Sequence, residues 1–341
     1  MKDFSINFKL WHGLKSNDIA ALSNSLSRMA RLSKLYLNSL GSPTFDQTSL
    51  RSLANSLQSL TKLQKLHLQF LSYDGANPGC FDIISKAFEN SPTLSNLILD
   101  FSRALVVSEA AQNLLLSLQT LTNLSKLDIN LSCCQHVNND VIQSLGQGIT
   151  KLTNLSSLKL NFSQCPAING QGLIFLTDIL KNLPSLKIFE LILTNRPLKS
   201  AFLSFSEALE HLVNLSKLRL NFGFSKDLEN PEIKALARSL QKIENLEYLE
   251  LNLSCSLHIT DEGLHDLASQ IGNLRSLKML SLNFYGCHKI TSEGFQYLKS
   301  QLAQLESLKK TYLNFPSVIS SDGFTRPREQ KPSEKSLCSL I

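Results

Sequence analysis

Short segments in which apolar and polar residues alternate recur along almost the whole chain. The segment Leu249-Glu-Leu251-Asn-Leu253 is representative, because its leucines stand at every second position. Successive side chains of a β-strand point to opposite faces, so this pattern predicts a strand with one buried and one solvent-facing side. Eleven such segments begin 29 to 31 residues apart, at Phe4, Leu35, Leu66, Leu97, Leu127, Leu158, Phe189, Leu218, Leu249, Leu280 and Thr311.

A turn and a helical pattern separate each segment from the next. A single apolar residue follows the second strand leucine after eight positions, as at Ile259 and Ile290. Helix-capping residues come next, for example Thr260-Asp261-Glu262 and Ser292-Glu293. Apolar residues at helical spacing then predict an amphipathic helix. In one unit these residues are Leu264, Leu267, Ile271 and Leu274.

A strand, a turn and a helix in about 31 residues cannot bury their own apolar sides, so the units must stack on one another. Stacking places the strands in a parallel sheet on a concave side and the helices on a convex side. The sequence therefore predicts one α/β solenoid over residues 1–324. The polar, proline-containing residues 325–341 are predicted to form a flexible tail.

These repeats resemble the leucine-rich-repeat superfamily, in particular its ribonuclease-inhibitor-like branch with a helix in every unit. The Leu-x-Leu-Asn-Leu/Phe extension is most similar to the long repeats of ciliate protists, and Ile259-Thr-Asp-Glu-Gly263-Leu264 resembles repeats of F-box proteins. The resemblance covers residues 4 to 324 and implies a horseshoe. It says little about function, because this architecture serves many unrelated binding roles.

One solvent-facing residue stands between the two strand leucines of each unit, and these residues form a column on the concave side. They vary in charge, size and aromaticity, as expected of a specific protein-binding face. Tyr36, Tyr248 and Tyr312 are the expected anchors, because interface energy concentrates in aromatic residues and arginine. The candidate partner-binding residues of the column are Tyr36, His67, Asp128, Lys159, Glu190, Arg219, Glu250 and Tyr312.

Two further columns flank the first one. Asparagine follows the second strand leucine in most units and either forms an amide ladder along the sheet or offers a polar strip to a partner. Lysine precedes the strand in several units and forms either an ordinary solvated edge or an attractive rim for an acidic partner. These lysines are Lys34, Lys65, Lys126, Lys217 and Lys310.

Cysteines occur in the turns of several units, four or five residues after the second strand leucine. Stacked turns would bring Cys255, His258, Cys287 and His288 near one another, and such a set suffices for zinc. The spacing is not that of a standard finger, and the turn cysteine is a packing residue in related repeats. We therefore expect no metal. The turn cysteines are Cys133, Cys134, Cys165, Cys255 and Cys287.

Other functional classes find little support in the sequence. It contains no Gly-rich phosphate loop, no Gly-x-Ser-x-Gly elbow and no His-Glu-x-x-His motif, so we expect neither an enzyme nor a cofactor. The net charge of +6 is small for 341 residues and is not interleaved with aromatic residues, which argues against nucleic acid. The first residues lack the apolar core of a signal peptide, and the odd number of cysteines, seven, favours free thiols, so we expect a cytoplasmic protein.

The last four residues, Cys338-Ser339-Leu340-Ile341, match the C-a-a-X prenylation pattern. Ile341 resembles the leucine that usually directs geranylgeranylation. A single prenyl chain anchors a protein only marginally, so the pattern implies at most a peripheral membrane contact. Coincidence is the alternative, since the motif is short.

The leading hypothesis is an intracellular adaptor that binds a protein on its concave face and is tethered through Cys338. A regulator of a small GTPase is an alternative, by analogy with leucine-rich-repeat GTPase activators. A substrate receptor in ubiquitin ligation is another, although no F-box motif stands before the repeats in this sequence.

Overall fold

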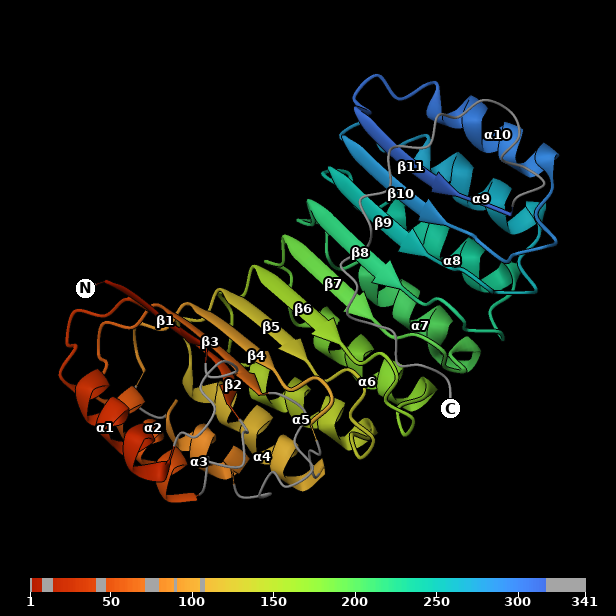
Figure 1. Ribbon diagram of the computed structural model, residues 1–341. Coiled ribbons are helices and arrows are strands. Elements are labelled where there is room, and N and C mark those ends of the chain that lie inside the picture. Colours follow the sequence, from red (N-terminus) through yellow and green to blue (C-terminus); the bar gives the residue numbers. More distant parts are fainter. Residues whose placement is uncertain are drawn as a thin grey trace.

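Parallel strands form a single open sheet whose order follows the chain. The computed structural model describes residues 2–7, 15–40, 47–70, 80–88, 91–104 and 108–316. Within these ranges eleven strands pair with their sequence neighbours (Figure 1). They are β1 (Asp3–Asn7), β2 (Lys34–Leu40), β3 (Lys65–Phe70), β4 (Asn96–Asp100), β5 (Lys126–Asn130), β6 (Ser157–Asn161), β7 (Ile188–Ile192), β8 (Lys217–Asn221), β9 (Tyr248–Asn252), β10 (Met279–Asn283) and β11 (Lys310–Asn314).

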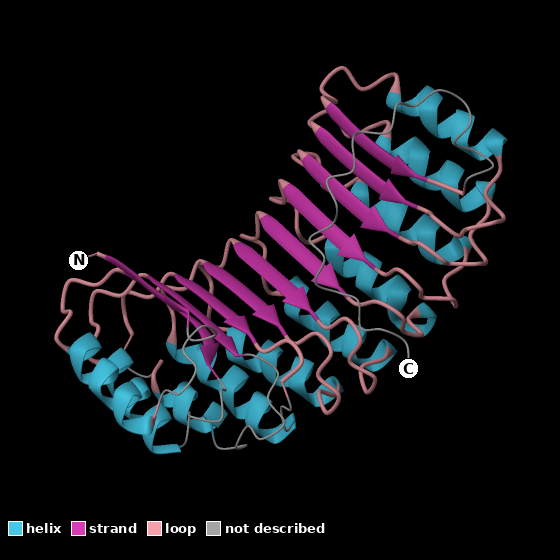
Figure 2. Cartoon of the chain, viewed as in Figure 1, coloured by secondary structure: helices cyan, strands magenta, loops and turns pink. Residues whose placement is uncertain are grey.

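Helices cover the outer side of this curved sheet, and the strands line its inner side (Figure 2). This arrangement confirms the predicted α/β solenoid. The helices are α1 (Ser16–Ser27), α2 (Gln47–Gln58), α3 (Cys80–Lys86), α4 (Ser108–Ser117), α5 (Asn139–Ile149), α6 (Gly170–Lys181), α7 (Lys199–Leu209), α8 (Asn230–Leu240), α9 (Asp261–Ile271) and α10 (Ser292–Leu302), with a 3-10 turn, η2 (Leu118–Thr120), after α4.

The strand leucines stack in register and form a continuous core between the sheet and the helices. Leu249 is paired with Leu280, and Leu251 with Leu282. All four side chains are buried, as the alternating pattern predicted. In β11 the equivalent Leu313 is only partly buried, because no further described repeat covers it.

The asparagines at the strand ends mainly stabilise the turns that follow them. Asn130 Oδ1 accepts a hydrogen bond from the backbone N–H of Ser132 at 3.1 Å, and Asn252 Oδ1 accepts one from Ser254 at 3.0 Å. This bond closes an Asx turn and satisfies a backbone donor. A ladder bond along the sheet is described between Asn314 Nδ2 and Asn283 Oδ1, at 3.1 Å. The turn-forming role was not among the two interpretations drawn from the sequence.

Three turn cysteines are core residues. The Cys134, Cys165 and Cys287 thiols are buried, and each donates to a main-chain carbonyl of the preceding repeat at 3.0 to 3.2 Å. Cys133 and Cys255 are half-buried instead. Across the described ranges, no three His, Cys, Asp or Glu side chains gather closely enough to hold a metal ion.

The starts of α9 and α10 are tied to the previous repeat. Asn230 Oδ1 accepts from the backbone N–H of Thr260, and Thr260 in turn caps α9 through Glu262 N–H, as predicted. The cap of α10 is Thr291, and Ser292 is the first helical residue, so the prediction was wrong by one position. Asp261 repeats the role of Asn230 by accepting from the Thr291 N–H at 2.8 Å.

Candidate protein-binding face on the concave sheet

The predicted partner-binding residues all lie at the same register position on the inner face of the sheet. Lys159 is aligned with Glu190, Glu190 with Arg219, and Arg219 with Glu250. Asp128 precedes them on β5 and is aligned with Lys159. Tyr36 and His67 are aligned on β2 and β3, and Tyr312 stands on β11. The strand order therefore divides the eight residues into a central group on β5 to β9, an N-terminal pair on β2 and β3, and Tyr312 on β11.

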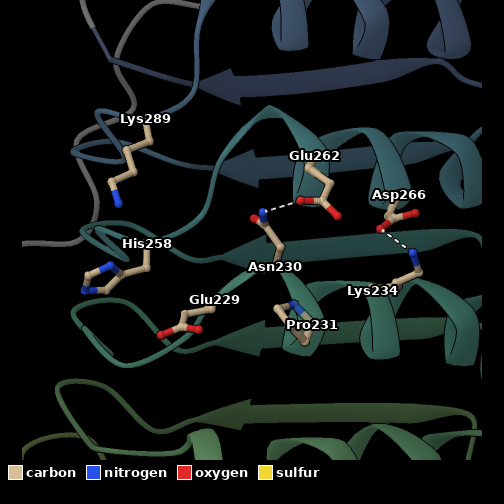
Figure 3. Close-up of a pocket in the computed structure, with 8 residues that line it drawn as sticks. All are labelled: Glu229, Asn230, Pro231, Lys234, His258, Glu262, Asp266 and Lys289. Carbon is tan, nitrogen blue, oxygen red and sulfur yellow. Dashed lines mark hydrogen bonds and ion pairs between the residues drawn. The ribbon is translucent and has the colours of Figure 1, made fainter.

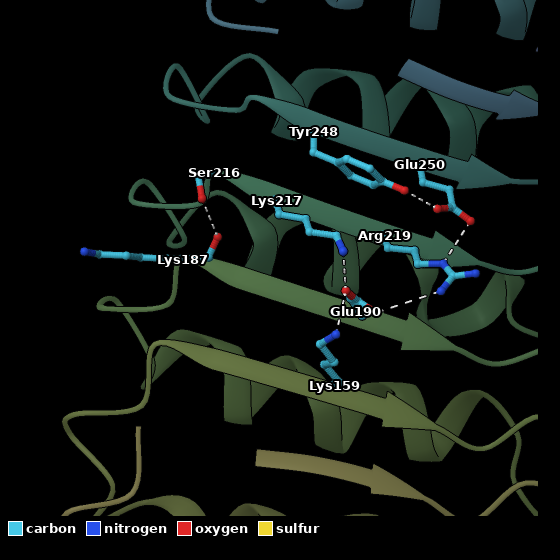
Figure 4. A network of polar contacts seen from close by, with 8 residues as sticks. All are labelled: Lys159, Lys187, Glu190, Ser216, Lys217, Arg219, Tyr248 and Glu250. Carbon is cyan, nitrogen blue, oxygen red and sulfur yellow. Dashed lines mark hydrogen bonds and ion pairs between the residues drawn. The ribbon is translucent and has the colours of Figure 1, made fainter. Parts of the chain in front are cut away.

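Glu190 is the centre of an ion-pair network on strands β6, β7 and β8 (Figure 4). Its Oε1 lies 3.1 Å from Lys159 Nζ and 2.7 Å from Lys217 Nζ, and its Oε2 lies 3.9 Å from Arg219 Nη1. The Glu190 side chain is only 10% exposed, so the surrounding cations shield it from water. An enclosed carboxylate of this kind is strongly held in place by its partners.

Arg219 extends the network to β9. Its Nε donates to Glu250 Oε1 at 2.9 Å, and the Tyr248 hydroxyl donates to Glu250 Oε2 at 2.7 Å. The Lys217 ammonium lies 4.7 Å from the centre of the Tyr248 ring, a cation–π contact. One cationic side chain thus touches both the carboxylate of Glu190 and the ring of Tyr248.

The electrostatics of these groups follow from burial and from their partners. Burial alone would raise the pKa of Glu190, but hydrogen bonds and charges from Lys217 and Lys159 outweigh it, so the pKa lies below its usual value of 4.5. Burial and the bond to Glu250 raise the pKa of the Tyr248 hydroxyl. Glu190 is therefore ionised at neutral pH, and Tyr248 is a neutral donor.

Asp128 differs from the other carboxylates of the face. Burial raises its pKa, Lys159 opposes the shift, and Glu190 and Asp100 add to it. It makes no ion pair within the described part of the chain, because Lys159 turns toward Glu190. Asp128 is thus a carboxylate with unused capacity for a cationic or hydrogen-bond-donating group of a partner.

An aromatic pair marks the N-terminal part of the face. The rings of Tyr36 and His67 meet edge to face with centroids 6.0 Å apart, and Lys65 Nζ lies 5.1 Å from the Tyr36 ring centre. Burial lowers the pKa of His67. At the other end, Tyr312 is 39% exposed on β11. The predicted residues therefore form three separate surfaces rather than one.

In the sequence, Lys217 belongs to the lysines predicted to form either a solvated edge or a rim for an acidic partner, and Tyr248 is an expected anchor. The structure places both in the central network. The sequence did hold an indication of this role, because Lys217 begins the strand that carries Arg219 and Tyr248 begins the strand that carries Glu250. It could be recognised only from the arrangement of neighbouring strands.

A groove lies away from the concave face, beside the N-terminal ends of α8 and α9 (Figure 3). Lys234 and Asp266 form an ion pair across it at 3.4 Å, and Asn230 donates to Glu262 at 3.0 Å. These two pairs satisfy four of its polar side chains, and Glu229 pairs with Lys199 outside the groove. The lining residues are Glu229, Asn230, Pro231, Lys234, His258, Glu262, Asp266 and Lys289.

The predicted lipidation residue, Cys338, lies outside the described residues, as does the whole of 325–341. The tail boundary and the modification stay predictions. None of the helices within the described ranges has both the length and the apolarity needed to cross a bilayer.

Comparison with known proteins supports the fold. No protein-family model matches the sequence, and no curated protein sequence is similar to it. Among solved structures, the chain is similar to Rad7 in the crystal structure of the Rad7 and Elc1 complex in yeast, with a TM-score of 0.57 and 19% sequence identity. The match covers 93% of this chain and 70% of that one. At this identity the likeness shows the repeat-solenoid fold alone; the ribonuclease-inhibitor-like branch and the ciliate similarity stay predictions.

Proposed function

We propose that this chain is a non-catalytic scaffold that binds a protein partner along the concave face of its sheet. The observation that carries the proposal is the network around Glu190, which holds Arg219 and Tyr248 in fixed positions on an open surface. Side chains that are already ordered lose little conformational entropy on binding. Arginine and tyrosine are also the residue types that dominate interface energies.

The separate surfaces of the face add support. The Tyr36–His67 pair, the incompletely satisfied Asp128 carboxylate and the exposed Tyr312 ring lie along one sheet of parallel strands. A solenoid of this kind offers an extended binding surface, so a partner can contact several repeats at once. Rad7, which has a similar fold, was crystallised in a complex with another protein, Elc1. That complex supports a protein as the partner.

The proposal includes a peripheral membrane tether through Cys338. The support is the C-a-a-X pattern of residues 338–341. A prenyl chain at that end would hold the scaffold near a membrane without a spanning helix.

The test of concave binding is capture from native cells with matched variants. Full-length wild-type protein, Arg219→Ala, Tyr312→Ala and Arg238→Ala would serve as baits. Arg238 is an exposed arginine on the convex helix α8 and provides the matched control. We expect a protein that is captured by the wild type and by Arg238→Ala but reduced with both concave variants. Equal capture by folded Arg219→Ala and Tyr312→Ala proteins would contradict the proposal.

A further inference from the structure

The first repeat of the solenoid leaves part of its apolar side uncovered. Phe4 on β1 and Leu22 on α1 pack against the core but are only partly buried. The equivalent residues of the second repeat, Leu35 and Leu53, are fully buried. An internal repeat is covered by the repeat before it, whereas β1 is paired with β2 alone among the described strands. We call the uncovered side of β1 and α1, with Phe4 and Leu22, the N-terminal face.

The last repeat is uncovered on its opposite side. Leu308 and Leu313, which lie before and within β11, are only partly buried, whereas their equivalents Leu277 and Leu282 are buried. In the described part of the sheet, β11 is paired with β10 alone. We call the uncovered side of β11, with Leu308 and Leu313, the C-terminal face. The two faces lie at opposite ends of the sheet (Figure 1).

The two faces are complementary, because together they reproduce the contact that joins each internal repeat to the next. Inside the sheet the apolar residues of neighbouring strands are in register, as Leu251 is with Leu282. The same register continued beyond β11 would align Leu313 with Ile6 of a second copy. One chain thus carries both halves of a repeat-to-repeat contact, which favours a second copy over an unrelated protein as the occupant.

The backbone groups at the two edges match in the same way. The carbonyl of Lys278, just before β10, accepts the backbone N–H groups of Lys309 and Lys310 at 2.9 and 3.1 Å. The carbonyl of Lys309 has the equivalent position before β11, and it accepts no backbone N–H from the described residues. The N–H of Asp3 in a second copy would supply that bond. A strand edge with free groups of this kind pairs readily with another strand.

The charges at the two edges are opposite. Lys310 begins β11, is exposed and forms no ion pair with the described residues. The continued register would place it beside Asp3 of the second copy. The Asp3 side chain is 56% exposed and lies 3.0 Å from Lys34. The sheet already contains a carboxylate between two lysines, at Glu190, so the contact adds an attraction at the edge instead of a repulsion.

We propose that this protein self-associates head to tail, with the C-terminal face of one copy against the N-terminal face of another. The contact joins β11 to β1 in parallel, so the sheets of the two copies form one longer concave surface. It is heterologous, and it leaves one face of each kind free for further copies. The contact uses the two ends of the sheet and does not rest on the proposed partner binding. A failure of either proposal would therefore leave the other standing.

Sedimentation velocity of full-length Cys338→Ser protein, which cannot be prenylated, tests the inference. The mean sedimentation coefficient should rise between about 1 and about 100 μM without a plateau at the value of a dimer. Phe4→Glu and Leu313→Glu each place a carboxylate in one face and should raise the dissociation constant roughly tenfold or more. Leu203 on α7 is 47% exposed, and Leu203→Glu should associate like the parent.

A mixture of the two face variants distinguishes this contact from one between identical faces. Phe4→Glu keeps its C-terminal face and Leu313→Glu keeps its N-terminal face, so together they should form a dimer with one copy of each and nothing larger. Lys310→Asp changes an exposed residue outside the core, so it should leave the melting temperature unchanged and weaken self-association.

Three results would overturn the inference. The first is a parent protein that stays monomeric over the whole concentration range. The second is a folded Phe4→Glu or Leu313→Glu protein that self-associates undiminished on its own, because identical faces would then be in contact. The third is a Leu203→Glu protein that loses as much association as the face variants, because the contact would then lie on the convex side.

Discussion

The Lys217 ammonium on β8 lies 2.7 Å from Glu190 Oε1 on β7, although the two residues are not register partners. Lys217 is aligned with Ile188, and its side chain reaches diagonally to Glu190, two residues further along β7. Diagonal neighbours on a sheet are within reach of long side chains. This contact joins the lysines that precede the strands to the column of residues that contains Glu190, and it shields Glu190 from solvent.

Replacing Glu190 with glutamine should destabilise the protein by about 1–3 kcal/mol, because Lys159, Lys217 and Arg219 lose their shared anion. The pKa of Glu190 is lowered in the folded state, so its contribution is present above the usual value of 4.5 and disappears as pH falls through the folded value. Urea denaturation should therefore show the wild-type advantage at neutral pH and its loss in acid. Parallel pH profiles for the two proteins would contradict this account of Glu190.

Gly263 should be needed because of a residue in the preceding repeat. A Cβ added at Gly263 would lie 2.7 Å from Asn230 Oδ1, the atom that accepts from the backbone N–H of Thr260, the cap residue of α9. Gly263→Ala should cost about 1–3 kcal/mol of unfolding free energy, since a well-packed site does not accept the extra atom. Adding the same change to an Asn230→Ala protein should cost less, because the clash is gone. An equal cost in both backgrounds would show that the two residues do not interact.

The turn cysteines should differ in reactivity. Burial raises the pKa of the Cys134 thiol to about 12 and the pKa values of the Cys165 and Cys287 thiols to about 11. The thiolate is the reactive species, so these three should resist iodoacetamide in the folded protein. Among the described turn thiols, the half-buried Cys133 and Cys255 should react first with iodoacetamide. Peptide mapping by mass spectrometry would test the order, and early labelling of Cys134 would argue against its place in the core.

Prenylation of Cys338 predicts a change in cellular distribution. Cys338→Ser protein should shift from the membrane fraction to the soluble fraction, because it lacks the prenyl chain that would anchor it to the membrane. The mass of the C-terminal peptide from native cells should also exceed its unmodified value. An unmodified mass in wild-type protein would remove the tether from the proposal while leaving the concave face untouched.

The solenoid could be predicted from the sequence because the apolar residues that produce it recur at a regular interval. Leucines such as Leu249 and Leu280 recur at a spacing that only stacked repeats can bury. The contacts of the site could not be predicted in the same way. The Lys217–Glu190 ion pair depends on the direction in which the lysine side chain extends from β8 toward β7. The asparagine column shows a different limit. The side-chain oxygen of Asn283 accepts both from a local backbone N–H, that of Tyr285, and from Asn314 on the next strand, and the residue pattern does not distinguish the two roles.

The central claim is that the concave face supplies the partner's binding energy. Once a captured partner is purified, calorimetry with wild-type protein, Arg219→Ala and Arg238→Ala would measure that energy directly. We expect the Kd to rise roughly tenfold or more for Arg219→Ala, because a held interface arginine is lost, and to stay unchanged for Arg238→Ala on the convex side. An unchanged Kd for folded Arg219→Ala together with a weakened Kd for Arg238→Ala would place the binding surface on the helices instead.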